Sequence, residues 1–209
     1  MHRRIFAAAL AVGLFSLTVS AQTPPTPPTQ PTPPTRIRGK IASLDGQLLK
    51  IDRRDGQKIE VRLNDPLTVT TVKNVPLASV APGSYIGTAT RTGADGKLTA
   101  IEVLVFPEAM RGAGEGHYAW DLEPGSMMTN GAVNGVVDGT SGRELKISYK
   151  GESNSVTVPP NTPVVTFAPA ERADLKAGAP VFLSATKNAE GQFMSGRVTV
   201  GKDGVVPPM

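Results

Sequence analysis

The residues best suited to chemistry lie together between positions 107 and 130. This stretch contains the only tryptophan of the chain, one of its two histidines and three of its six methionines. Imidazole, carboxylate and thioether groups are ligands of zinc and copper ions. The candidate metal ligands are His117, Asp121, Glu123, Met127 and Met128. A closed zinc site usually has four Cys or His ligands, whereas this stretch has one His and the chain has no Cys, so a Cu or Zn cofactor is the alternative interpretation.

The first interpretation of the same stretch is a contact surface that uses no cofactor. Large aromatic side chains dominate buried interfaces, so packing and recognition explain them without a metal. The residues expected to contact a ligand or partner are Arg111, Glu115, Tyr118 and Trp120. The partner would be an envelope protein, a glycan or a small ligand.

The sequence predicts no catalytic residues. A Ser-His-Asp triad would have to use His117, yet the chain has no Gly-x-Ser-x-Gly elbow, and Ser126 follows Pro-Gly as expected for a turn. Asp121 and Glu123 could form the acid–base pair of a hydrolase, but solvated loop acids are far more common. We therefore expect a protein that is not an enzyme, with a hydrolase left as a formal alternative.

The N-terminus has the pattern of a secretory signal peptide. Arg3 and Arg4 precede an apolar run over residues 5–15, and Val19-Ser20-Ala21 matches a signal-peptidase site. Eleven apolar residues are fewer than the roughly 20 that cross a bilayer, so cleavage is favoured over an uncleaved anchor. We expect an exported, periplasmic or secreted protein with a signal peptide at 1–21 and no transmembrane segment after cleavage.

Residues 22–36 are rich in Pro and Thr, which predicts an extended polyproline linker. The net charge of +4 falls to +2 once Arg3 and Arg4 are removed with the signal peptide. Basic residues of the predicted strands, such as Lys50 and Lys58, alternate with acids. Mixed charge and few aromatic residues argue against a nucleic-acid partner.

The second half of the chain repeats the first at a spacing of 95 residues. Matched pairs are Leu63 and Val158, Val80 and Leu175, Gly83 and Gly178, Ile86 and Val181, Gly96 and Gly191, Leu98 and Phe193, and Val103 and Val198. Since turn glycines and apolar positions match together, we expect two copies of one fold. The predicted organisation is a first repeat at 37–106, a connector at 107–129, a second repeat at 130–202 and a tail at 203–209.

Within each repeat, alternating apolar residues and Asp-Gly turns predict short strands. The first repeat is expected to form a three-stranded meander, a turn at Asp65-Pro66, a short strand over 68–72, a helical turn within 76–80 and two closing strands. A helical turn is also expected within 169–175. The predicted fold class is all-β, with two tandem OB-like barrels of five to six strands; an immunoglobulin-like sandwich is the alternative.

The Gly-x-Ile/Val openings, the Asp-Gly turns and the Val80-x-x-Gly83 and Leu175-x-x-Gly178 elements resemble tandem exported bacterial β-barrel domains of unknown function. The connector RGAGEGHYAWDLEPGSMMTN, residues 111–130, is similar to that of an uncharacterised proteobacterial family of such proteins. The resemblance implies the fold and export, and it implies no activity.

Overall fold

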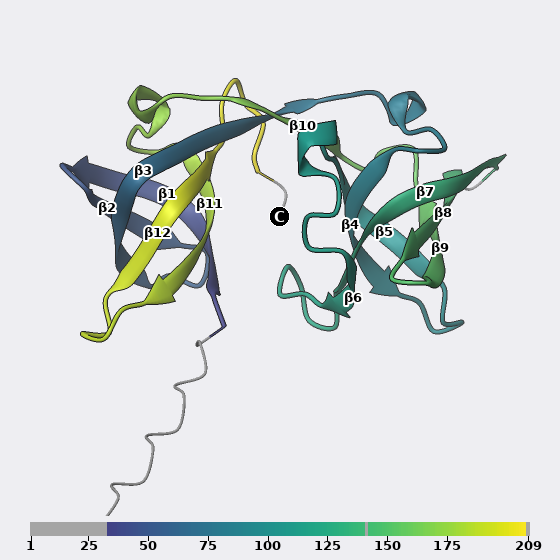
Figure 1. The fold of residues 1–209 in the computed structure, drawn as a ribbon, viewed down its shortest axis with the longest axis horizontal. Helices are drawn as coiled ribbons and strands as arrows, with labels where there is room; N and C mark the ends of the chain where they lie inside the picture. The colour runs from purple at the N-terminus through teal and green to yellow at the C-terminus, as the bar shows by residue number, and fades with distance from the viewer. Residues whose placement is uncertain (1–32, 141, 208–209) are drawn as a thin grey trace, which may run out of the picture. The chain divides into compact units, whose positions relative to one another are not determined.

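The computed structural model describes residues 33–140 and 142–207 (Figure 1). The predicted signal peptide and most of the Pro/Thr linker lie outside these residues. The strands are β1 (Thr35–Asp45), β2 (Leu48–Arg53), β3 (Lys58–Asn74), β4 (Tyr85–Thr92), β5 (Leu98–Val105), β6 (Gly116–Ala119), β7 (Met127–Gly139), β8 (Gly142–Tyr149), β9 (Glu152–Val158), β10 (Val164–Pro169), β11 (Pro180–Lys187) and β12 (Phe193–Val200). The predicted all-β class is confirmed.

The helical segments of the described residues are single 3-10 turns. They are η1 (Leu77–Ser79), η2 (Glu108–Met110) and η3 (Arg172–Asp174). The two predicted helical turns are thus confirmed as η1 and η3, while η2 was not predicted. Within residues 33–140 and 142–207, no helix has the length and apolar character needed to cross a bilayer.

Five strands close into a barrel, which we call the terminal barrel because it combines strands from both ends of the described chain. Antiparallel pairing runs in the order β12-β11-β1-β2-β3, and a parallel pairing of β12 with β3 closes it (Figure 1). Apolar side chains alternate inward along each strand. They include the fully buried Ile37, Leu49, Ile51, Val61 and Val198.

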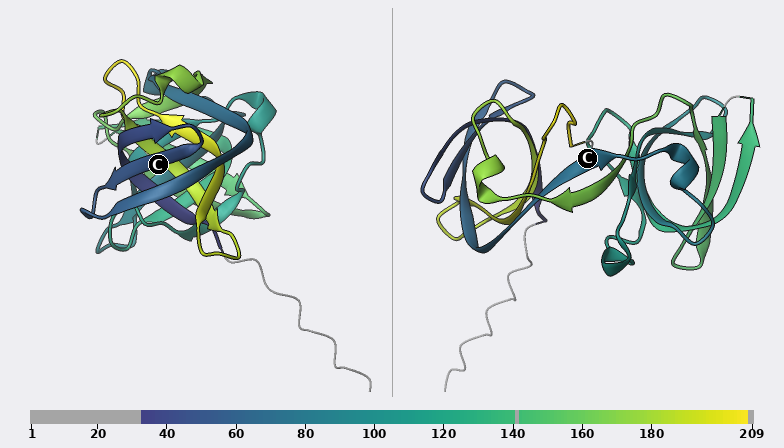
Figure 2. Two further views of the ribbon diagram at one scale, coloured as in Figure 1. Left: turned by 90° about the vertical axis from the view of Figure 1, so that its left-hand side faces the viewer. Right: turned by 90° about the horizontal axis from the view of Figure 1, so that it is seen from above.

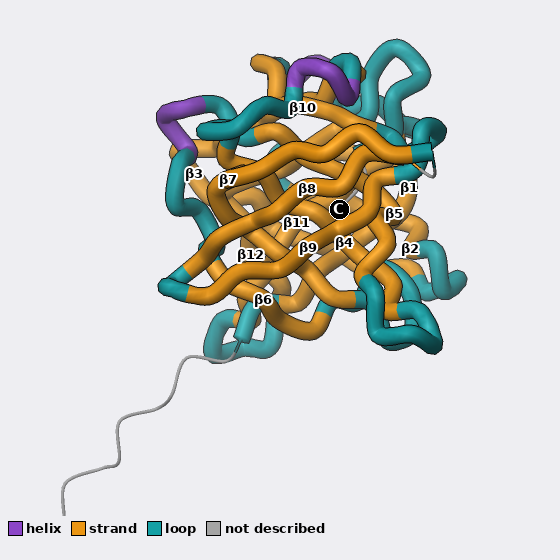
Figure 3. Tube along the Cα trace, turned by 90° about the vertical axis from the view of Figure 1, so that its right-hand side faces the viewer, coloured by secondary structure: helices purple, strands orange, loops and turns teal. Residues whose placement is uncertain are grey.

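Five other strands form a second body, which we call the central lobe. Antiparallel pairing runs in the order β5-β4-β7-β8-β9, and a short parallel pairing of β5 with β9 joins the ends. Its core includes Ile86, Val103, Leu145, Ile147 and Val156. Figure 3 shows strands crossing this side of the molecule, with helical segments at the upper edge of the view. Both bodies belong to one compact unit.

The strand pairing differs from the expected division into repeats at 37–106 and 130–202. The first meander, β1–β3, pairs with the hairpin β11–β12 from the second half, and the second meander, β7–β9, pairs with the hairpin β4–β5 from the first half. The chain does not reverse at the expected Asp65-Pro66 turn, because β3 continues as one strand of 17 residues; the register of its pairing with β12 shifts there, between Leu63 and Thr68. The second part of β3 leads the chain out of the terminal barrel, and the next two strands, β4 and β5, therefore lie in the central lobe.

The two crossing segments pair with each other. The end of β3 runs antiparallel to β10, with Val72 opposite Phe167, and these two residues are 95 positions apart in the chain. Seen from above in Figure 2, β3 and β10 pass side by side. Val72, Leu104 and Val165 form a small buried cluster at this crossing. The crossing of β3 and β10 is therefore stabilised by its own small hydrophobic cluster.

Candidate functional site

The connector turns back on itself as a hairpin between β6 and β7. The backbone N–H of Trp120 donates to the carbonyl of Ser126 at 2.8 Å, and the Ser126 hydroxyl accepts from the Glu123 N–H at 3.2 Å. Ser126 is buried, as suits a side chain that satisfies the backbone inside a turn. This turn, residues 120–126, places Trp120 and Asp121 against the start of β1.

Two arginines of β1 meet this turn. Residues 36 and 38 lie on the same face of the strand because side chains alternate. The Arg36 guanidinium lies 3.8 Å from the centre of the Trp120 ring, and that of Arg38 lies 5.6 Å from it. Nη1 of Arg38 donates to Oδ1 of Asp121 at 3.0 Å, and Nη1 of Arg36 is 3.7 Å from the same oxygen. We call Arg36, Arg38, Trp120 and Asp121 the arginine–tryptophan cluster.

Arg38 is the buried member of the cluster. Its side chain is 9% exposed, and its Nε and Nη2 are buried with no hydrogen-bond partner. Nε1 of Trp120 is in the same condition. Burial lowers the pKa of Arg38, and the neighbouring Asp121 carboxylate opposes that shift. Three nitrogen donors of the cluster are thus left without an acceptor.

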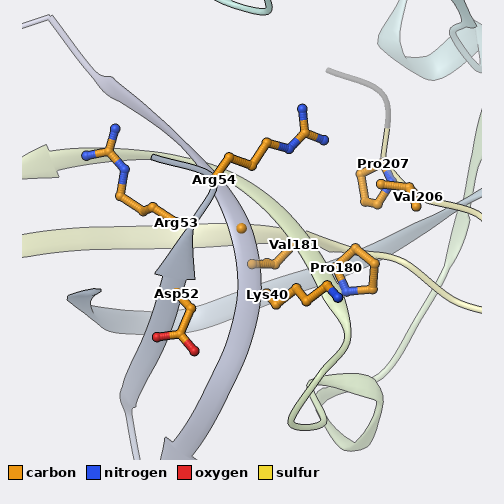
Figure 4. Close-up of a pocket in the computed structure, with 9 residues that line it drawn as sticks. Lys40, Asp52, Arg53, Arg54, Pro180, Val181, Val206 and Pro207 are labelled. Atoms are coloured by element: carbon orange, nitrogen blue, oxygen red, sulfur yellow. The ribbon is translucent and has the colours of Figure 1, made fainter. Parts of the chain in front are cut away.

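A cavity of about 350 Å³ adjoins the cluster. It is lined by Arg36, Arg38, Arg53, Arg54, Asp55, Asp121 and Leu122. Four arginines against two aspartates give the lining a formal charge of +2. A neighbouring cavity of about 360 Å³ shares Arg53 and Arg54. Figure 4 shows these two side chains extending in opposite directions from the end of β2, with Arg54 on the side of Pro207. Cationic side chains therefore border both cavities.

Glu102 is a buried acid close to the cluster. It is 4% exposed, and its Oε1 has no hydrogen-bond partner. Burial raises the pKa of Glu102 to about 8, although Arg38 and Arg54 act in the opposite direction. Burial therefore favours the protonated form of this carboxyl group.

The predicted contact residues divide into two groups. Trp120 lies in the cluster, and Tyr118 meets its ring edge-on at 6.0 Å between centroids. Arg111 instead forms a two-pronged ion pair with Glu108 and donates to the carbonyl of Gly83 at 2.8 Å. Glu115 accepts from the backbone N–H of Lys150 at 2.9 Å. The structure thus brings together Tyr118 and Trp120, while Arg111 and Glu115 hold the connector to the central lobe.

The predicted metal ligands lie in separate contacts. Nδ1 of His117 is 2.8 Å from the Thr129 hydroxyl, and its ring stacks on Tyr149. Asp121 pairs with Arg38, and Glu123 forms two 2.7 Å hydrogen bonds with Arg91. Met127 is half-buried and Met128 fully buried on β7. In the part of the chain that the structure describes, no three His, Asp or Glu side chains are grouped as a metal site.

Sequence reasoning missed the arginines of β1 and the buried Glu102. Arg36 and Arg38 alternate in the run TRIRGK, which is an ordinary pattern for a solvent-facing strand. Glu102 stands inside the apolar run AIEVLV, and an acid in such a run is a signal of burial.

Comparisons of the chain with known protein families, with characterised proteins and with solved structures find no match. The function is therefore inferred from the side chains of the cluster and its cavity.

Proposed function

We propose that the chain is a non-enzymatic exported binding or accessory module, built from two related halves that exchange hairpins, and that its ligand contacts the arginine–tryptophan cluster. The partner would be an envelope protein, a glycan or a small ligand. The expectation of export rests on the sequence of residues 1–21.

The observation that supports this proposal most is the burial of Arg38. An arginine side chain loses hydration when it is buried, and a group left without partners adds a further cost. An apolar side chain at position 38 would give the folded protein at least the same stability. Arg38 lines a cavity and has hydrogen-bond donors without partners, which favours a role in ligand binding over a role in stability.

The connector acids support a binding role over catalysis. Glu123 is held by Arg91, which lowers the pKa of its carboxyl group, and Asp121 is paired with Arg38. A general acid needs a carboxyl group that carries a proton near neutral pH, and its pKa is usually raised. Glu123 does not have that environment, and the Asp121 carboxylate is engaged by Arg38.

The proposal is tested by nuclear magnetic resonance of the mature protein, residues 22–209, titrated with a panel of ligands. The panel contains neutral and acidic oligosaccharides, peptidoglycan fragments, Cu(II) and Zn(II). Trp120 is the only tryptophan, so the single indole N–H signal reports on the cluster directly. We expect at least one organic ligand to shift this signal together with the backbone signals of Arg36 and Arg38.

Perturbations confined to surfaces away from the cluster would contradict the assignment of the site. A shift centred on His117 with Cu(II) or Zn(II) alone would replace it with the metal-binding alternative. The matched variant is Trp120→Phe, which removes the indole N–H and retains an aromatic ring.

A further inference from the structure

We infer that the cavity beside Arg38 binds an oxyanion group of the ligand, a carboxylate or a phosphate, and that the Asp121 carboxylate stands in its place in the free protein. This inference rests on the proposed function and names the chemistry of its ligand.

The unpaired atoms of the cluster define the ligand chemistry. Nε and Nη2 of Arg38 and Nε1 of Trp120 are all hydrogen-bond donors, and none of them has an acceptor. A complementary ligand must supply acceptors. A neutral hydroxyl brings a donor with every oxygen, whereas an ionised carboxylate has acceptor oxygens alone and a phosphate has mostly acceptor oxygens at neutral pH. The donor set therefore favours an oxyanion.

The geometry of arginine points the same way. Nε and Nη2 form one edge of the planar guanidinium, and such an edge binds two oxygens of a carboxylate or phosphate side by side. In the structure only the other terminal nitrogen of Arg38, Nη1, is engaged, by Asp121. The two-nitrogen edge of Arg38 has no acceptor, but it is buried in the free protein, so an oxyanion reaches it only when the groups packed around it move.

The charge around the cavity also suits an anion. Arg36, Arg53 and Arg54 line it together with Arg38, and the lining carries a formal charge of +2 even with Asp55 and Asp121 included. Several arginines facing one space repel one another, and a bound anion relieves that repulsion. An added negative group would therefore be attracted to this cavity.

Asp121 shows that a carboxylate fits between the arginines. Its Oδ1 lies within 4 Å of both Arg36 and Arg38, although the side chain is 49% exposed. Asp121 and Trp120 belong to the same turn, and both lie against the guanidinium of Arg38. A ligand oxyanion thus enters as the turn shifts away from β1 and the Asp121 carboxylate leaves Arg38 for solvent.

Tryptophan fluorescence tests this inference. The mature protein is titrated with inorganic phosphate and, separately, with citrate as a carboxylate, each at constant ionic strength set with sodium chloride. Because Trp120 is the sole tryptophan, a saturable change in its emission reports binding at the cluster. We expect such a change with at least one anion. The anion with the lower Kd shows whether the site prefers a phosphate or a carboxylate.

Two variants make the test specific. Asp121→Asn removes the competing carboxylate and should tighten oxyanion binding by about tenfold, which corresponds to about 1.4 kcal/mol. Arg38→Gln should abolish the saturable change. Arg36→Gln is the second variant, for use if Arg38→Gln fails to fold, because Arg36 is less buried. It should weaken anion binding by about threefold. The control is Arg62→Gln, an exposed arginine of β3 that does not line the cavity, which should bind like the wild type.

Lack of a saturable response in both the wild type and Asp121→Asn would overturn the inference. So would unchanged or weaker binding in Asp121→Asn, since Asp121 would then be only a structural ion pair. If a neutral oligosaccharide shifts the Trp120 indole signal and neither phosphate nor citrate gives a response, the proposed binding function is supported and the inference of an oxyanion ligand is wrong.

Discussion

The terminal barrel and the central lobe have the same local structure where their meanders begin. Gly39 of β1 and Gly131 of β7 each pack beneath a carbonyl oxygen of the next strand, that of Asp52 in the barrel and that of Ser148 in the lobe. The residue before each glycine is buried and polar: Arg38 is 9% exposed and Asn130 is 7% exposed. Arg38 and Asn130 therefore occupy matched positions.

The two positions differ in what surrounds them. In the central lobe, β6 pairs with residues 127–130 of β7, and Nδ2 of Asn130 lies within 3.4 Å of the carbonyls of Ala113 and Gly114 and of the Tyr118 hydroxyl. In the terminal barrel, no described strand pairs with residues 35–38 on the side away from β11, and a cavity lies beside Arg38. The connector supplies three acceptors near Nδ2 of Asn130, whereas it supplies Arg38 with Asp121 alone, and a cavity adjoins Arg38. In this sense we call the position of Asn130 filled and that of Arg38 open, and we expect a ligand at Arg38.

The largest effect is expected from a methyl group at either glycine. A Cβ at Gly39 would lie 2.8 Å from Cγ2 of Ile51, and one at Gly131 would lie 2.9 Å from Cγ2 of Ile147, with a backbone carbonyl also in the way in each case. Because backbone must move, we expect Gly39→Ala and Gly131→Ala each to lower the free energy of unfolding by more than about 4 kcal/mol. Urea unfolding measures this.

The control for the glycines is Gly135→Ala, a glycine of β7 where the nearest atom to a Cβ is 3.6 Å away. It should change stability by less than about 1 kcal/mol. If Gly39→Ala or Gly131→Ala alone were tolerated, the two meanders would not be packed alike, and matching Arg38 with Asn130 would lose its basis.

The second effect comes from Glu102, whose counterpart 95 positions later on β12 is the exposed Arg197. The pKa of Glu102 is about 8 in the folded protein against an ordinary value of 4.5. As pH rises from 4.5 to 8, the unfolded chain loses this proton while the folded chain keeps it, so stability falls. We expect a loss of roughly 4 kcal/mol between pH 5 and 9.

Glu102→Gln should remove most of this pH dependence and raise stability at pH 9, as measured by urea unfolding at several pH values. Arg197→Gln should retain the wild-type pH dependence. A flat profile in the wild type would mean that Glu102 reaches water or a partner, and the contrast between the two hairpins at this position would disappear.

The third effect separates the filled position from the open one. Asn130→Ala removes the amide that holds the connector, and we expect it to lower the free energy of unfolding by about 2 kcal/mol. Arg38→Met removes unpaired donors and leaves Asp121 half-exposed, so we expect a change within about 1 kcal/mol of zero. An equally large loss in Arg38→Met would indicate that Arg38 serves stability and would weaken the case for a ligand.

Alternation and turn chemistry were sufficient for the local structure. The Asp-Gly turns, the two helical turns and the all-β class follow from residues that are close in sequence, such as Asp45-Gly46 between β1 and β2. Alternation assigns the faces of a strand and does not assign its neighbours. The exchange of hairpins between the two halves therefore could not be predicted from the pattern.

The candidate site was predicted in part. Trp120 stands out by composition as a contact residue, but its partner Arg38 is 82 positions away, and their contact depends on how the connector folds back onto β1. The burial of Arg38 and Glu102 depends on the packing around that contact. Such long-range packing leaves no local signal apart from an acid inside an apolar strand.

The smallest effect is expected at the ion pair that joins the connector turn to the central lobe. Arg91 and Glu123 make two short hydrogen bonds, and the pairing raises the pKa of Arg91 and lowers that of Glu123. The Arg91 side chain is 61% exposed, and exposed pairs add little to stability. We expect Arg91→Gln to change the Tm by less than about 2 °C and to leave Trp120 emission unchanged.

The matched variant is Ser126→Ala, which removes a buried hydroxyl inside the same turn and should lower the Tm more than Arg91→Gln does. A red shift of Trp120 emission in Arg91→Gln would mean that the central lobe holds the turn against β1. Access of a ligand to Arg38 would then depend on the central lobe, through the ion pair of Arg91 with Glu123. With no shift, the contacts of Trp120 and Asp121 with β1 are sufficient to hold the turn, and access to Arg38 depends on the terminal barrel alone.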